Sequence, residues 1–297
     1  MSYMAISQRR RSLPPLEVGD RRLSFGQRAY VMGVVNVTPD SFSDGGHFFD
    51  KGRAVEHALE LWEAGADILD IGGESTRPGA EPVSAAEEMA RVVPVIEAVT
   101  ERCEAWISVD TYKADVARAA VEAGADLVND ISGLGFDEAM GPTVADLQCG
   151  LVLMHIRKTP KTMQDQVAYD ELVGDIRTYF KDRLQRAEKA GIDPSRILLD
   201  PGIGFGKTVA HNYRLIRELS SFVDLGHPLL VGTSRKSFIG AVLDRPPQQR
   251  TWGTAATVAC AILTGADIVR VHDVEEMVQV TRVAEAICAM DGAQISR

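Results

Sequence analysis

The sequence has few of the features that mark secreted, membrane-spanning or nucleic-acid-binding proteins. Only four of its 297 residues are cysteines, and none forms a C-x-x-C pair, which favours buried thiols in a reducing compartment. No stretch approaches the roughly 18 apolar residues of a membrane helix. Acidic residues outnumber basic ones by 42 to 32, and the net charge of −10 argues against nucleic-acid binding. We therefore expect a cytoplasmic globular protein with neither a membrane nor a nucleic-acid partner.

Eight short apolar runs rich in β-branched residues recur along the chain. They are continuous rather than alternating, which is typical of strands that are covered on both faces. The runs lie at 31–36, 67–72, 106–110, 126–130, 150–155, 196–200, 228–233 and 267–272. Amphipathic segments separate them, at 52–64, 86–101, 113–123, 169–190, 251–264 and 274–289. A Gly-Ala-Asp step precedes three of the strands, and its glycine suits a left-handed helix terminus.

Eight alternating strand and helix units predict an α/β protein with a single (β/α)₈ (TIM) barrel domain. We expect the barrel over residues 30–290 and a C-terminal tail over 291–297. Residues 1–29 form an N-terminal extension in this interpretation, with a small hairpin between Leu16 and Phe25 at the bottom of the barrel. A doubly wound open sheet is the alternative, but no dinucleotide-binding fingerprint follows the first strand.

Functional side chains of a TIM barrel lie at the carboxyl ends of the strands. The predicted strands here all end in polar or charged residues, and their convergence on one rim is difficult to explain as solvated loops. Two loops rich in glycine, proline and hydroxyl side chains follow strands directly, at 38–46 and 75–79, and have the composition of mobile lids. The segment 202–208 resembles a P-loop, but Pro201 stands where that motif requires glycine.

Seven motifs, in order from about residue 30 to 275, resemble those of the dihydropteroate synthases. They are NVTPDSFSDGG at 36–46, GGESTRPG at 72–79, SVDT at 108–111, NDI at 129–131, DPGIGFGK at 200–207, SRKS at 234–237 and RVHDV at 270–274. The resemblance implies a homodimeric TIM-barrel transferase that is a target of sulfonamides. Such an enzyme joins 6-hydroxymethyl-7,8-dihydropterin diphosphate to 4-aminobenzoate, which releases diphosphate and gives 7,8-dihydropteroate for folate biosynthesis.

The residue types agree with binding of a pterin. A buried pterin edge needs carboxylates for its N–H donors, and amide or cationic donors for its acceptors. Asp110 and Asp200 offer the carboxylates, and Asn129 and Lys236 offer the complementary groups. By resemblance, the pterin pocket comprises Thr76, Asp110, Asn129, Met154, Asp200 and Lys236.

The resemblance also assigns residues to the diphosphate, the metal and the second substrate. It implies that Arg270, Val271 and His272 bind the diphosphate and that Asn36 ligates a Mg²⁺ ion bridging its oxygens. The candidate 4-aminobenzoate site comprises Phe42, Thr76, Arg77, Pro78, Phe205 and Ser237. The candidate catalytic residues are Asp44, Lys236, Arg270 and His272. Lys207 and Arg235 are as well explained by a structural role as by a functional one.

We expect a dissociative, SN1-like reaction in which the C–O bond to diphosphate loosens before the neutral arylamine attacks. One position departs from the family pattern: Lys158 stands where Met-His-x-x-Gly-x-Pro has glycine, and a positive φ there would strain the loop by about 1 kcal/mol. Two alternatives remain, a pterin-dependent methyltransferase and a non-catalytic pterin-binding protein. The diphosphate and loop motifs at 270–272 and 75–78 disfavour the methyltransferase, and the intact loops at 38–46 and 75–79 disfavour the binding protein.

Overall fold

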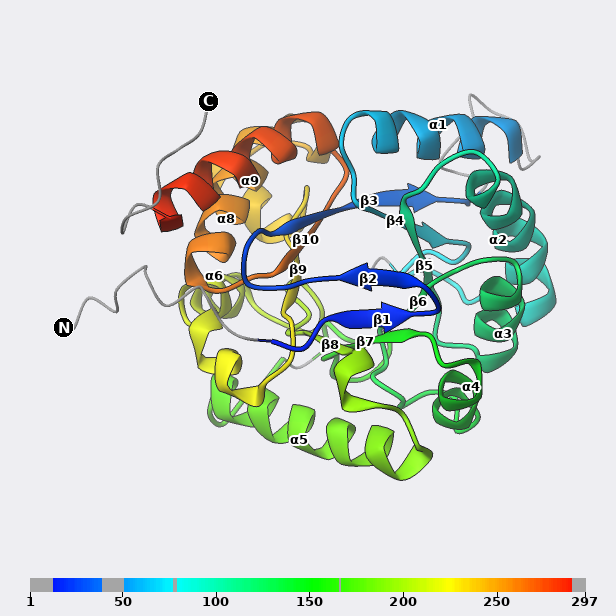
Figure 1. The fold of residues 1–297 in the computed structure, drawn as a ribbon. Helices are drawn as coiled ribbons and strands as arrows, with labels where there is room; N and C mark the ends of the chain where they lie inside the picture. Colours follow the sequence, from blue (N-terminus) through cyan, green and yellow to red (C-terminus); the bar gives the residue numbers. More distant parts are fainter. Residues whose placement is uncertain (1–12, 39–50, 77–78, 166, 290–297) are drawn as a thin grey trace.

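The computed structural model describes residues 13–38, 51–76, 79–165 and 167–289. Eight parallel strands within these residues form one sheet, in the order β8-β7-β6-β5-β4-β3-β10-β9 (Figure 1). The strands are β3 (Tyr30–Asn36), β4 (Ile68–Gly72), β5 (Trp106–Asp110), β6 (Leu127–Asp130), β7 (Gly150–Met154), β8 (Ile197–Asp200), β9 (Leu230–Gly232) and β10 (Ile268–Val271). A bridge between Leu199 and Leu229 joins the two outer strands. The predicted TIM barrel is therefore confirmed.

Helices follow every strand of the barrel and cover its outer surface (Figure 1). The described α-helices are α1 (Lys51–Glu63), α2 (Ala85–Thr100), α3 (Ala114–Glu122), α4 (Met140–Leu147), α5 (Leu172–Ala190), α6 (Val209–Arg217), α7 (Ser237–Leu243), α8 (Thr251–Thr264) and α9 (Val274–Ala289). Short 3₁₀ segments lie at η3 (Pro194–Arg196), η4 (Leu219–Leu225) and η5 (Pro247–Gln249). The six helices expected from the sequence are present with ends within three residues, whereas α4, α6 and α7 were not predicted.

Each of the three Gly-Ala-Asp steps has two structural roles at the bottom of the barrel. Their glycines have φ values of 103°, 112° and 119°, the left-handed conformation that was expected for helix ends. Their aspartates, Asp67, Asp126 and Asp267, each accept a hydrogen bond from the backbone of the adjacent strand. The donors are the N–H groups of Val31, Ile107 and Leu229, at 2.9, 2.8 and 2.9 Å. One repeated tripeptide thus ends a helix and fixes the register of a strand pair.

An antiparallel hairpin of β1 (Leu16–Val18) and β2 (Arg21–Leu23) lies across the amino ends of the barrel strands (Figure 1). Arg21 donates to Asp126 and Arg28 donates to Asp67, each at 2.6 Å. Two of the three aspartates from the Gly-Ala-Asp steps therefore also hold the N-terminal segment. Apolar side chains fill the space beneath the hairpin: Leu16, Leu23, Phe25, Tyr30, Met32, Ile68, Trp106, Leu127, Val152, Leu198, Leu230 and Ile268. The hairpin expected at 16–25 is present and closes this end.

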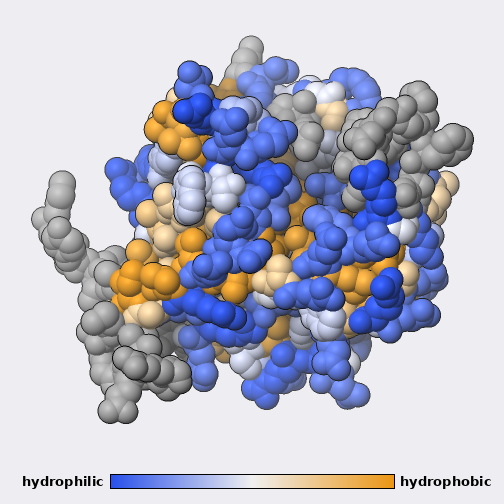
Figure 2. Space-filling view, turned by 90° about the horizontal axis from the view of Figure 1, so that it is seen from above, coloured by the Kyte–Doolittle hydropathy of each residue, from blue (hydrophilic) through white to orange (hydrophobic). Residues whose placement is uncertain are grey.

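The exact domain limits at 29/30 and 290/291 stay predictions, because residues 1–12 and 290–297 lie outside the described residues. None of the described helices is both long and apolar enough to cross a membrane. Figure 2 shows a face on which hydrophilic residues surround a band of hydrophobic ones. In the described part of the chain, no disulfide joins the four cysteines.

Candidate active site

A cluster of charged groups occupies the interior of the barrel toward the carboxyl ends of the strands. Arg270 on β10 donates from Nε to Asp70 Oδ2 at 2.6 Å and from Nη2 to Asp110 Oδ2 at 2.8 Å. Asn129 Nδ2 on β6 donates to the same Asp70 oxygen at 3.1 Å. The structure thus brings together three predicted residues, Arg270, Asp110 and Asn129, around a carboxylate that was not predicted.

Asp70 is the residue that the sequence analysis missed. It lies inside β4, two positions before the strand ends, and its side chain is fully buried. The predicted site residues come from the carboxyl ends of strands, whereas Asp70 interrupts the apolar run Ile68-Leu69-Asp70-Ile71. A single carboxylate within a buried strand was the available signal, because burial of an unpaired charge is costly.

Two carboxylate oxygens in this cluster accept no hydrogen bond from the residues that the structure describes. Asp110 Oδ1 and Asp70 Oδ1 are buried, and no described residue donates a hydrogen bond to either atom. A buried acceptor without a donor costs about 1–3 kcal/mol, more for a charged group. Burial raises the pKa of Asp110 to about 7, although the nearby Arg270 lowers it. These oxygens are suited to receive N–H donors from a ligand.

Asp200 and Lys236 form the second part of the polar site. Asp200 ends β8, is buried, and accepts the backbone N–H of Gly202 at 2.7 Å through Oδ1. Lys236 donates to the carbonyl of Ile203 and lies 4.7 Å from the ring centroid of Phe205. Burial lowers the pKa of Lys236 to about 8, while the charge of Asp200 opposes this shift. Burial also raises the pKa of Asp200, which Lys236 lowers.

Met154 lies in a small hydrophobic cluster beside the charged groups. The buried members are Ile131, Met154, Ile156 and Met163, with Tyr112 and Phe205 packed against them. Met154 ends β7 and is followed in the chain by His155. The cluster offers an apolar surface at the same end of the barrel as the carboxylates.

The residues predicted for diphosphate and metal lie on neighbouring strands. Val271 ends β10 next to the β3 strand, and the following His272 has Nδ1 3.0 Å from Ser234 Oγ. Asn36 is the last residue of β3, is half-buried, and lies opposite Gly72 of β4. The described residues contain no group of three or more His, Cys, Asp and Glu that could hold a metal by itself. Asn36 therefore fits Mg²⁺ only as one ligand beside water and phosphate oxygens, which is a usual arrangement for this ion.

The predicted 4-aminobenzoate site is described only in part. Phe42, Arg77 and Pro78 lie outside the described residues, as does Asp44, which was predicted as a catalytic residue. Among the others, Thr76 and Phe205 are half-buried, and Ser237 is exposed at the start of α7.

Lys207 and Arg235 are engaged inside the protein. Lys207 is buried, with Nζ 3.0 Å from His155 Nδ1 and 2.9 Å from the Phe205 carbonyl, and burial lowers the pKa of both Lys207 and His155. Arg235 binds both carboxylate oxygens of Asp273. These contacts favour the structural interpretation for both cations.

Lys158 has the left-handed backbone that its glycine-like position suggested. Its φ is +61°, and Nζ donates to the carbonyl of Asp165 at 2.6 Å. The loop therefore keeps the conformation that favours glycine and uses the lysine side chain for a contact that glycine cannot make.

Comparisons with known proteins agree with one another. The family model described as "Pterin binding enzyme" matches residues 32–272. A dihydropteroate synthase of Synechocystis sp. is 51% identical over 275 residues, which is 92% of this chain and 95% of the relative. That of Escherichia coli is 48% identical over 257 residues, covering 86% and 91%.

Solved structures are similar over nearly the whole chain. A Yersinia pestis dihydropteroate synthase with a sulfonamide drug complex gives a TM-score of 0.88 at 46% identity, covering 92% of this chain and 98% of that one. A Xanthomonas albilineans dihydropteroate synthase with 4-aminobenzoic acid gives 0.87 at 45% identity, covering 94% and 99%.

Proposed function

Because the chain belongs to the pterin-binding enzymes and, among them, to the dihydropteroate synthases, which are transferases, we propose that it condenses 6-hydroxymethyl-7,8-dihydropterin diphosphate with 4-aminobenzoate. The products are 7,8-dihydropteroate and diphosphate. The observation that carries this proposal is the buried Asp110 Oδ1, which has no hydrogen-bond donor among the described residues. A pterin presents adjacent N–H donors and would supply one.

The remaining groups of the cluster complement the rest of the pterin. Asp200 offers a second carboxylate, Asn129 an amide, and Lys236 a cation whose ammonium otherwise faces the Ile203 carbonyl and the Phe205 ring. The hydrophobic cluster around Met154 supplies a surface for the face of the ring. The polar edges of the pterin would thus face charged or amide side chains, and the face of its ring would lie on apolar ones.

Arg270 would bind the diphosphate leaving group. Its Nε and one Nη2 hydrogen are used by Asp70 and Asp110, which leaves donors of the guanidinium for phosphate oxygens. Burial alone would lower the pKa of Arg270, but the two carboxylates raise it above its ordinary value, so the group stays cationic. His272, next to it on the rim, would add a further donor to the diphosphate.

The proposed reaction is dissociative. Asp110 and Asp200 hold the electron-rich dihydropterin, on which positive charge develops as the C–O bond lengthens, and Arg270 stabilises the charge gathering on diphosphate. A Mg²⁺ ion held by Asn36 and phosphate oxygens would neutralise further negative charge on the leaving group. The arylamine is neutral at pH 7 and attacks the methylene carbon directly, so the chain need not supply a strong base. The amine loses its proton to solvent after attack.

The test is diphosphate release by the purified protein with the pterin diphosphate and Mg²⁺, with and without 4-aminobenzoate. We expect release that depends on 4-aminobenzoate and matches dihydropteroate formation mole for mole. Asp110→Asn keeps the size of the side chain and removes its charge, and this variant should lose pterin binding. Pterin binding by the wild type without product would instead support a pterin-binding protein or a methyltransferase.

The proposed homodimer and sulfonamide sensitivity have separate support. Trp252 at the start of α8 is 83% exposed, and Val242 and Leu243 at the end of α7 are also exposed; the residue after Trp252, Gly253, packs against Leu243. Exposed apolar groups of this kind mark protein interfaces. Light scattering should give the mass of two chains for the wild type and of one chain for Trp252→Glu.

Since a similar structure holds a sulfonamide drug, we expect sulfonamides to inhibit this protein and added 4-aminobenzoate to relieve the inhibition.

A further inference from the structure

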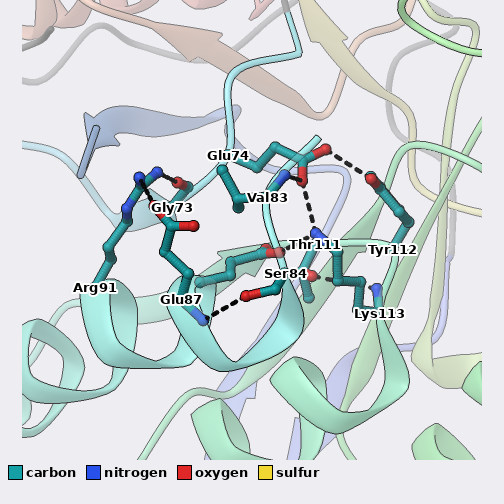
Figure 3. A network of polar contacts seen from close by, with 10 residues as sticks. Gly73, Glu74, Val83, Ser84, Glu87, Arg91, Thr111, Tyr112 and Lys113 are labelled. Carbon is teal, nitrogen blue, oxygen red and sulfur yellow. Dashed lines mark hydrogen bonds and ion pairs between the residues drawn. The ribbon is translucent and has the colours of Figure 1, made fainter. Parts of the chain in front are cut away.

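Glu74 joins the two ends of the segment between β4 and α2. Its Oε2 accepts the backbone N–H of Val83 at 2.9 Å and the Nζ of Lys113 at 2.6 Å, and its Oε1 accepts the Tyr112 hydroxyl at 2.7 Å (Figure 3). The Glu74 side chain is only 7% exposed. One buried carboxylate therefore connects the start of this segment, its end, and the loop after β5.

The surroundings of Glu74 fix it to α2. Lys113 also donates to Glu88 of α2, whose side chain is 1% exposed, so one ammonium lies between two carboxylates. Arg91 of α2 donates to the carbonyl of Gly73 at 2.7 Å (Figure 3). Charge-assisted hydrogen bonds in a buried setting are about twice as strong as neutral ones. The base of the segment is consequently held by several strong contacts.

Tyr112 connects this base to the proposed pterin site. Its hydroxyl faces Glu74, while its ring packs on the cluster that contains Met154 and stacks edge-on against Phe136, with 5.4 Å between ring centroids. Burial and the adjacent Glu74 raise the pKa of Tyr112 to about 12. The phenol therefore keeps its proton and remains a donor to Glu74 over the working range of pH.

We propose that Tyr112 and Glu74 are positioning residues that couple the two substrate sites through their hydrogen bond. The bond ties the segment carrying Thr76, a candidate residue for both substrates, to the apolar cluster expected under the pterin ring. Thr76 is two residues from Glu74, so the position of that carboxylate sets the position from which Thr76 reaches its ligand. Holding the segment in advance reduces the entropy lost when the second substrate binds. This inference rests on the proposed function, because it concerns the substrates of that reaction.

The first test variant is Tyr112→Phe, which keeps the ring and its packing and removes only the hydroxyl. We expect the KM for 4-aminobenzoate to rise about 10- to 150-fold, as for loss of a hydrogen bond to a charged group. The KM for the pterin diphosphate should rise less, because Thr76 is one of six candidate residues for that substrate and the other five lie outside the segment that Glu74 holds. Unchanged kinetics, or equal rises in both KM values together with a lower Tm, would overturn the proposal.

The second variant is Glu74→Gln, which preserves shape but weakens the bonds from Tyr112 and Lys113. If the two residues act through one bond, the double variant should be no worse for 4-aminobenzoate than the worse single variant. Multiplicative losses would show independent effects and overturn the coupling.

A matched control removes a tyrosine hydroxyl at the opposite end of the barrel. Tyr30 is buried, and its hydroxyl donates to the carbonyl of Ser24 at 2.9 Å, far from the proposed site in the bottom cluster. Tyr30→Phe should lower the Tm without changing either KM. If the wild-type protein forms product and Tyr112→Phe has the same kinetics, the coupling is refuted and the proposed function stands. Wild-type protein that forms no product would refute the proposed function, and the coupling with it.

Discussion

Two side chains of the proposed pterin site should give its binding a narrow pH optimum. Asp110 must be ionised to accept N–H donors, and burial raises its pKa to about 7. Lys236 must be protonated to donate, and burial lowers its pKa to about 8. Below the first value Asp110 takes up a proton, and above the second Lys236 loses one. Binding to the free enzyme should therefore be strongest near about pH 7.5, midway between the two.

The size of the effect follows from these two values. With both groups required, the competent fraction at about pH 6 and about pH 9 is roughly sevenfold below its maximum. The assay is calorimetric titration with a dihydropterin that lacks the diphosphate, so that no phosphate group of the ligand titrates. Affinities would be compared at intervals from about pH 5.5 to about pH 9.5.

Lys236→Arg separates the two limbs. The guanidinium does not deprotonate in this range, so the variant should lose the alkaline limb and keep the acid limb, whatever its overall affinity. An affinity that is flat across the range in the wild type, or an alkaline limb that persists in Lys236→Arg, would refute the assignment of these groups to the pterin site.

Three further variants test the framework. Asp70→Asn weakens the ion pair with Arg270. It should lower the free energy of unfolding by about 3 kcal/mol, measured by urea denaturation, and the kcat/KM for the pterin diphosphate at least tenfold, measured by steady-state kinetics. Wild-type values in both assays would contradict a role for Asp70 in holding Arg270. Gly202→Ala places a Cβ 2.0 Å from the His155 carbonyl oxygen at a φ of +68°, and should cost about 2 kcal/mol or more in the same denaturation assay; an unchanged midpoint would contradict this close approach. Phe180→Ala opens a cavity at a fully buried ring and should cost about 3–5 kcal/mol with unchanged KM values, so altered KM values would be unexpected.

Repetition made the barrel predictable from the sequence. Each strand is a continuous apolar run, and the Gly-Ala-Asp steps mark three of the strand starts, so local patterns and the global fold agree. The helices that were missed are short: α4 has eight residues, α6 nine and α7 seven, and α4 contains the Gly141-Pro142 pair. Segments of this length hold few turns from which to read a helical period, although α3, also nine residues long, was predicted from its amphipathic pattern.

The residues of the candidate site were partly predictable, but their pairings were not. Asp110, Asn129, Asp200 and Arg270 follow from the rule that strand ends carry function. The ion pairs of Arg270 span 200 and 160 residues of sequence, and nothing local specifies them. Asp70 was missed because it lies within its strand, although a carboxylate in a buried apolar run requires a cationic partner.

The hairpin at the bottom of the barrel blocks that end to ligands. Since β1 and β2 and the side chains beneath them fill the amino end, the described residues leave the carboxyl end as the entrance and exit for a compound bound among Asp70, Asp110 and Asn129. When two ligands share one entrance, the one that binds deeper must bind first. A pterin held at these carboxylates would precede 4-aminobenzoate, and the condensed product would leave by the route both had taken.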